Sequence, residues 1–94
     1  MATFKVSRLI RGNELFPTKV IINENGVTIK EPGFLNGRER MIPYRHISSV
    51  MVDSPLIGYS TIEIQTTGQD LFSINGFTMS EVQTMRDMIM YYGN

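Results

Sequence analysis

The only histidine of the chain, His46, lies in the segment IPYRHISSV (residues 42–50), directly after Arg45. Arg38 and Arg40 lie shortly before it, so this part of the chain combines an imidazole with guanidinium groups. Histidine is the commonest general base at neutral pH, and clustered arginines bind phosphate or carboxylate groups. The segment therefore raises two chemical hypotheses, a reactive site and an anion-binding site.

Enzyme chemistry has little support in the sequence. Nucleophilic catalysis needs a Ser, Thr or Cys held against a base, and His46 is the only histidine available for that role. Cysteine, the Gly-x-Ser-x-Gly motif, a His pair at helical spacing and EF-hand spacing are all absent. Asp53, Glu63 and Asp70 leave a paired-carboxylate site open, although acids scattered on exposed strand positions are usually solvated. We expect no enzyme activity, no cofactor and no metal.

An anion site is the more specific alternative. Arg38 and Arg40 stand two residues apart, so on a strand both side chains leave the same face. We expect Lys30 to join them from a neighbouring hairpin, with Arg45 close behind on an exposed turn. Such a patch would hold a phosphate group or an anionic lipid headgroup. Each cation also has an acid nearby in sequence, which favours an ordinary solvated strand face.

Charge and hydropathy narrow the classes of partner. The net charge is zero, which argues against a general affinity for nucleic acid. Residues 1–45 carry eight Lys or Arg and four Asp or Glu, whereas residues 46–94 carry one and five. If the two halves do not interleave, the protein is a dipole that could associate head to tail, and the alternative is mixed charge over a solvated surface. No apolar stretch reaches the roughly 20 residues that span a bilayer, and no signal peptide is recognisable, so a cytoplasmic location is the default expectation.

The pattern of apolar residues predicts one small, mainly β domain over residues 1–94. Residues 19–30 alternate about Asn25-Gly26, which is typical of a hairpin with these two residues at the centre of a type I′ turn. Further strands are predicted in the segments TFKVSRLI, RERMIPY, VMVDSP, YSTIEIQTT and QDLFSI. The expected result is six or seven short antiparallel strands.

The end of the chain predicts a helix from Met79 to Tyr92. Thr78 and Glu81 have the spacing of a capping box, and Gly93 stands where a left-handed residue commonly ends a helix. One apolar stripe on this helix is expected to pack on the sheet, and it consists of Val82, Met85, Met88, Ile89 and Tyr92.

Three apolar residues of the helix, Met79, Met90 and Tyr91, lie partly off this stripe. An apolar surface on a small protein is typical of an interface, so we expect these residues to contact a protein partner or another copy of the chain. The alternative is that flexible methionines fill a small core.

The order of four segments resembles the bacterial pleckstrin-homology (PH-like) domain family. They are ENGVTIKEPG, IPYRHISSV, LIGYSTIEIQTTG and INGFTMSEVQTM, and the resemblance covers about residues 19–92. It implies a strongly bent antiparallel sheet of about seven strands, forming an open barrel or sandwich that the carboxy-terminal helix closes at one end.

The resemblance also carries functional expectations. Bacterial members are similar to one another in scaffold rather than in catalytic residues, and they often serve as protein-binding or assembly modules that can form homo-oligomers. Eukaryotic PH domains are known for phosphoinositide and protein ligands, and the lipid-binding type uses a basic first hairpin. Lys5, Arg8 and Arg11 lie early in this chain without that pattern, so lipid specificity is not carried over.

Within this fold, IPYRHISSV is interpreted as a corner between two strands. Tyr44, Ile47 and Val50 recur every three residues and are expected to line one side of a tight helical turn that Pro43 opens. Arg45 and His46 then point outward. The leading hypothesis is a non-enzymatic binding module that uses open sheet edges and the apolar flank of the helix, and the alternative is weak binding of an anionic lipid.

Overall fold

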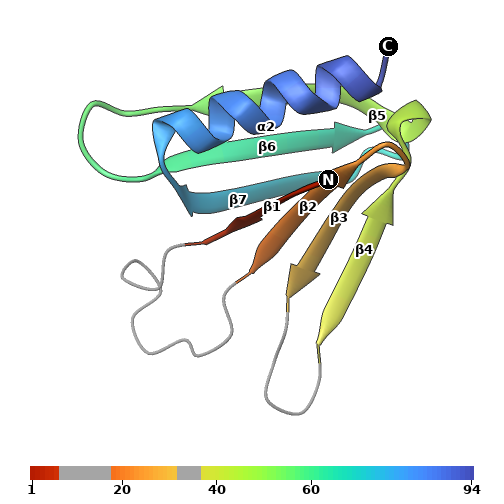
Figure 1. The fold of residues 1–94 in the computed structure, drawn as a ribbon, viewed down its shortest axis with the longest axis horizontal. Helices are drawn as coiled ribbons and strands as arrows, with labels where there is room; N and C mark the ends of the chain where they lie inside the picture. Colours follow the sequence, from red (N-terminus) through yellow and green to blue (C-terminus); the bar gives the residue numbers. More distant parts are fainter. Residues whose placement is uncertain (7–17, 32–36) are drawn as a thin grey trace.

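The computed structural model describes residues 1–6, 18–31 and 37–94 of the chain. Within these residues, seven antiparallel strands form a four-stranded sheet, β1-β2-β3-β4, and a three-stranded sheet, β5-β6-β7, and one helix follows them (Figure 1). The elements are β1 (Ala2–Lys5), β2 (Lys19–Asn23), β3 (Gly26–Glu31), β4 (Arg38–Ile42), η1 (Tyr44–His46), β5 (Ile47–Asp53), β6 (Ser60–Thr66), β7 (Leu71–Phe77) and α2 (Met79–Tyr92). The predicted mainly β class with one carboxy-terminal helix is confirmed.

The predicted hairpin forms between β2 and β3, but its turn lies one residue earlier than expected. Asn23 pairs with Gly26, so Glu24 and Asn25 are the central residues, and neither has a positive φ. The side-chain oxygen of Asn23 accepts hydrogen bonds from the N–H groups of Asn25 at 2.8 Å and Gly26 at 3.3 Å. This local bond stabilises a turn without left-handed residues, so the type I′ prediction is wrong.

Gly26 is required for a close approach of two strands. A Cβ atom at this position would lie 2.5 Å from the carbonyl oxygen of Ile42, at the end of β4. The hairpin and the end of β4 therefore meet at a distance that only glycine permits. Pro43 ends β4 as expected, because proline has no N–H to donate to a strand partner, and the short turn η1 follows.

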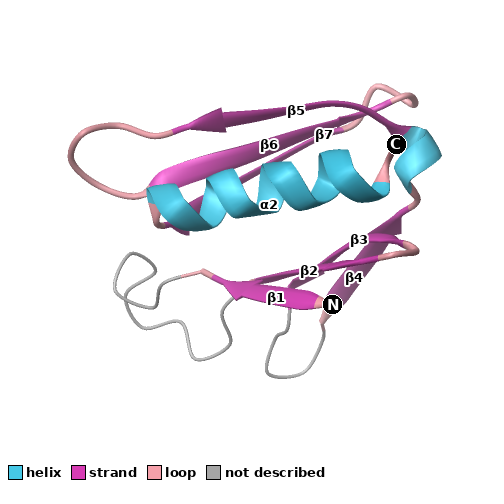
Figure 2. Ribbon diagram, turned by 45° about the horizontal axis from the view of Figure 1, so that its top comes forward, coloured by secondary structure: helices cyan, strands magenta, loops and turns pink. Residues whose placement is uncertain are grey.

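The α2 helix lies between the two sheets and contacts β2 and β3 on one side and β5 and β6 on the other (Figure 2). Its start is fixed by the predicted capping box, in which Thr78 and Glu81 each accept a hydrogen bond from the other's backbone N–H. Val82, Met85 and Ile89 of the predicted stripe are fully buried, and Met88 and Tyr92 pack at its margin.

The predicted left-handed end of the helix is wrong. Gly93 has φ −79° and ψ −3°, a right-handed helical conformation, and its N–H donates to the carbonyl oxygen of Ile89 at 2.9 Å. A Cβ atom on Gly93 would lie 2.9 Å from that oxygen and 3.7 Å from the Cβ atom of Tyr44. Crowding at the corner of the fold, rather than a positive φ, accounts for glycine here.

The buried apolar side chains form one cluster between the sheets and the helix. β2, β3 and β6 each contribute two alternate residues, as the period of two requires. The cluster consists of Val6, Val20, Ile22, Val27, Ile29, Ile42, Ile62, Ile64, Ile74, Phe77, Val82, Met85 and Ile89. No helix in the described part of the chain has the length and hydropathy to cross a membrane.

We predict that Gly26→Ala lowers the free energy of unfolding by about 1–3 kcal/mol, because the added methyl group must displace the end of β4. Gly68→Ala is the matched control, since its Cβ atom would have no neighbour closer than 3.9 Å. Urea denaturation of both variants measures the difference. Equal stability of the two would show that the hairpin and β4 do not need this close approach.

Candidate functional site

The strand β5 forms one edge of the three-stranded sheet. Among the described strands it pairs only with β6, so its other edge has no strand partner. An edge strand presents backbone N–H and C=O groups that an extended segment of another chain can bind. The first requirement for binding by strand addition is therefore met at β5.

A β-bulge at the start of β5 sets which side chains face the helix. Ile47 and Ser49 pair with adjacent residues of β6, so Ser48 is the additional residue. The Ser48 hydroxyl donates to a backbone carbonyl of β6 at 3.1 Å. Because of the bulge, Ile47 and Val50 face the same side although they are three residues apart.

This bulge corrects the interpretation of the repeat in IPYRHISSV. The helical turn includes only Tyr44–His46, whereas Ile47 and Val50 belong to β5. Pro43 precedes the turn as predicted and accepts a hydrogen bond from the N–H of His46 at 2.9 Å. The period of three therefore arises from a short turn followed by a bulged strand.

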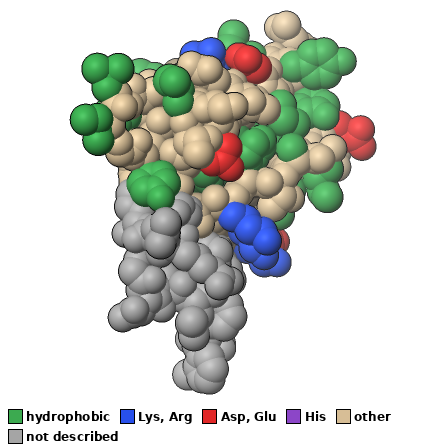
Figure 3. Space-filling model, turned by 60° about the vertical axis from the view of Figure 1, so that its left-hand side comes forward, with side chains coloured by type: hydrophobic (Ala, Val, Ile, Leu, Met, Phe, Trp, Pro, Cys, Tyr) green, Lys and Arg blue, Asp and Glu red, His purple; other side chains and the backbone are tan. Residues whose placement is uncertain are grey.

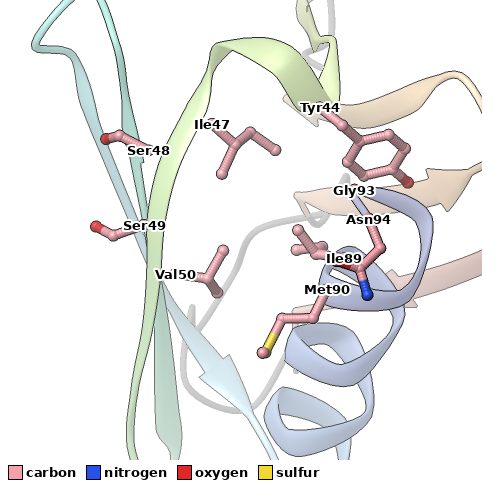
Figure 4. A pocket seen from close by; sticks show the side chains of 9 residues that line it. All are labelled: Tyr44, Ile47, Ser48, Ser49, Val50, Ile89, Met90, Gly93 and Asn94. Carbon is pink, nitrogen blue, oxygen red and sulfur yellow. The ribbon is translucent and has the colours of Figure 1, made fainter.

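An open groove lies between the first half of β5 and the last turns of α2. Its volume is about 390 Å³. Ile47 and Val50 point from β5 toward the helix, Met90 reaches from the helix toward β5, and the hydroxyls of Ser48 and Ser49 point away (Figure 4). The groove is lined by Tyr44, Ile47, Ser48, Ser49, Val50, Ile89, Met90, Gly93 and Asn94.

The lining of this β5–α2 groove contains no charged side chain among the residues that the structure describes. Apolar side chains occupy its floor, and the backbone of β5 runs along one wall. Such a surface favours apolar side chains of a ligand while backbone groups supply hydrogen bonds. The arrangement is suited to binding an extended peptide segment.

Tyr44 closes one end of the groove and joins it to the rest of the fold. Its hydroxyl donates to the carbonyl oxygen of Asn23 and lies 3.3 Å from that of Gly26, in the β2–β3 hairpin. Its ring stacks on Tyr92 of α2 with the centroids 5.9 Å apart. Burial, and secondarily the neighbouring Tyr92, raises the pKa of Tyr44 to about 12.

The structure does not bring the predicted cations together in one patch. Lys30 pairs with Glu39 across β3 and β4, and their charged groups lie 3.8 Å apart. Arg38 and Arg40 flank Glu39 on β4, so they share a face, as expected, but Lys30 leaves from the opposite face. The expectation that Lys30 joins the two arginines is wrong.

Arg40 is occupied in joining the two sheets. Its guanidinium lies 3.1 Å from the carboxylate of Asp70 and 5.2 Å from the centroid of Phe72 in β7. Arg45 and His46 are exposed on η1, as predicted. Within the described residues, no hydrogen bond links the His46 side chain to a serine or threonine. Arg40 and His46 line one pocket with Asp70, and Arg38 and Arg40 line another with Phe72, so these side chains are divided between two places.

The three off-stripe residues of the helix are exposed but do not form a common surface with the groove. Met79 is 55% exposed at the start of α2, whereas Met90 is 63% and Tyr91 77% exposed near its end. Only Met90 lines the groove. Tyr91 instead contacts the edge of the Tyr92 ring, with the centroids 5.4 Å apart.

Sequence reasoning missed the groove as a site and a second apolar feature, Leu56 and Ile57. The sequence pattern places Ile47 and Val50 on one side of a corner, but the bulge that turns them toward α2 has no signature in the sequence. Leu56 and Ile57 could be predicted as an apolar feature, because residues 54–62 contain no charged residue.

The sequence matches the family model described as bacterial PH domain over residues 6–92. No curated protein matches the chain. The matched range includes every strand after β1, the whole of α2 and all the residues that line the groove except Gly93 and Asn94.

We predict that Tyr44→Phe lowers the free energy of unfolding by about 1 kcal/mol, because the carbonyl oxygens of the hairpin lose their donor. The change also alters how the free energy of unfolding depends on pH in the alkaline range. The folded pKa of about 12 lies above the ordinary value of 10.0, so this contribution is complete below pH 10 and is lost as the pH rises toward 12.

In Tyr44→Phe this part of the pH dependence should be missing, as measured by urea unfolding at neutral and alkaline pH. Tyr91→Phe is the control, since Tyr91 is 77% exposed. An identical alkaline limb in wild type and Tyr44→Phe would contradict the assignment.

Proposed function

The chain belongs to the bacterial PH domain family, and from this premise we propose that it is a non-enzymatic module that binds an extended protein segment in the β5–α2 groove. PH domains are in general binding modules without catalytic activity, which is consistent with this class of function. The segment belongs to a partner protein or to another copy of the chain.

One observation carries the proposal: an open strand edge and an apolar, uncharged groove occur side by side. A segment that adds to β5 continues the sheet, so its alternate side chains leave on opposite faces. One set enters the groove between Val50 and Met90, and the other lies on the outer face beside Met51. We therefore expect ligands with apolar residues at every second position and tolerance for polar residues between them.

The anionic-lipid alternative has less support from the structure. Lys30 pairs with Glu39 and Arg40 with Asp70, so both cations already have an acidic neighbour. Arg38 begins β4 and Arg45 lies on η1 beyond its other end, so the length of the strand separates them. Surface ion pairs of this kind contribute little energy, but they lower the charge available to a headgroup.

We predict that peptides selected from a displayed random library bind the protein and lose at least about tenfold in affinity with Met90→Lys. A charged ammonium group in the groove must be desolvated when an apolar side chain enters. Met79→Lys is the matched control, because it places the same change on an exposed methionine at the other end of α2. Calorimetry measures both affinities.

The mode of binding is tested with N-methylated versions of the same peptides. Backbone hydrogen bonds of an added strand come from alternate residues, so methylation at one set of alternate positions should abolish binding and the other set should not. If the selected peptides bind Met90→Lys as well as wild type, or if both methylated sets bind equally, strand addition in this groove is refuted.

A further inference from the structure

The loop between β5 and β6 carries the most exposed apolar side chains of the described chain. Leu56 and Ile57 are 105% and 91% exposed, and Gly58 follows them with φ 102°. Figure 3 shows exposed hydrophobic side chains at several places on one face of the molecule. The group at its upper left contains no Lys, Arg, Asp or Glu side chain. We call residues 54–59 the tip loop.

The base of the tip loop is held by its neighbour strand. The side-chain amide of Asn75 in β7 donates to the carbonyl oxygen of Tyr59 at 3.3 Å and to the hydroxyl of Thr61 at 2.8 Å. Pro55 fixes one backbone angle just before Leu56. An apolar pair presented on a fixed base loses little conformational entropy on binding, which is the property of an anchor.

The tip loop and the groove have matching properties. Neither residues 54–59 nor the groove lining contains a charged side chain, so docking would bury no unpaired charge. One margin of each carries the opposite charge. Asp53 directly precedes the tip loop, whereas Arg45 adjoins Tyr44 at the groove. Arg86, one helical turn before Met90, is paired with Asp87 at 3.5 Å and adds no net charge there.

The two features cannot meet within one molecule. The groove is formed by the first half of β5 and the end of α2, whereas the tip loop lies beyond the other end of β5 (Figure 1). A contact between them must therefore join two copies, and it uses a different surface on each. Such a heterologous contact leaves one tip loop and one groove unoccupied and propagates as a chain.

We propose that the tip loop of one copy docks in the β5–α2 groove of the next, with Leu56 and Ile57 as the apolar anchors. The inference rests on the proposed function only in that it uses the same groove. Two anchoring side chains make a small interface, so the association is weak and reversible. The mass measured by sedimentation is expected to rise between micromolar and millimolar protein.

Complementary variants test the proposal. Leu56→Ser/Ile57→Ser removes the anchors and keeps the groove, whereas Met90→Lys impairs the groove and keeps the anchors. Each variant alone should remain monomeric. Their mixture should form a one-to-one dimer and stop there, because only one tip loop and one groove are competent. Leu71→Ser, on the outer face of the same sheet but on β7, is the control and should associate like wild type.

The possible outcomes separate this inference from the proposed function. Association that persists in Leu56→Ser/Ile57→Ser, or a mixture that stays monomeric, overturns the inference. A wild-type protein that is monomeric throughout also overturns it, and Met90-dependent binding of library peptides would then leave the proposed function intact. If no library peptide binds but the mixture forms a dimer, the head-to-tail contact stands and general peptide binding fails. Urea unfolding confirms that every variant is folded.

Discussion

The Tyr44 side chain joins three parts of the fold that are distant in the sequence. Its hydroxyl donates to a carbonyl of the β2–β3 hairpin, its ring stacks on Tyr92, and Gly93 lies against its Cβ atom. The corner between the two sheets, the first hairpin and the end of α2 are thereby held at one point. The end of α2 is one wall of the groove, so the position of that wall depends on this tyrosine.

Next to this corner, the bulge at Ser48 determines which side chains of β5 face the groove. Without it, regular alternation would turn either Ile47 or Val50 toward the outer face of the sheet. With it, both face α2, and their side chains lie opposite Met90. Beyond the bulge, from Ser49 to Asp53, β5 keeps a regular register with β6, so its edge there is a regular strand edge.

The elements of this fold were predictable from local signals, whereas contacts between elements were not. The Thr78 capping box and the strand pattern of YSTIEIQTT act within a few residues, and both the helix start and the strand are confirmed. The roles of Gly26 and Gly93 depend on the atoms of other segments, and there the predicted turn and helix end are wrong. The prediction that Lys30 joins Arg38 and Arg40 is wrong for a similar reason, because it depends on the register between β3 and β4.

The register between β3 and β4 also explains why the β5–α2 groove and the side chain of Arg40 lie on different sides of the molecule. Arg40 leaves the face of β4 that meets β7, where its guanidinium contacts Asp70 and Phe72. On the other side the sheets are joined through the apolar face of α2, which leaves the β5 edge open beside uncharged side chains. Arg40, which the sequence predicts as an anion-binding residue, thus contributes to joining the two sheets. Charged groups line the seam between β4 and β7, whereas the opening at β5 offers backbone hydrogen bonds and apolar contacts, the two interactions that an extended protein segment supplies.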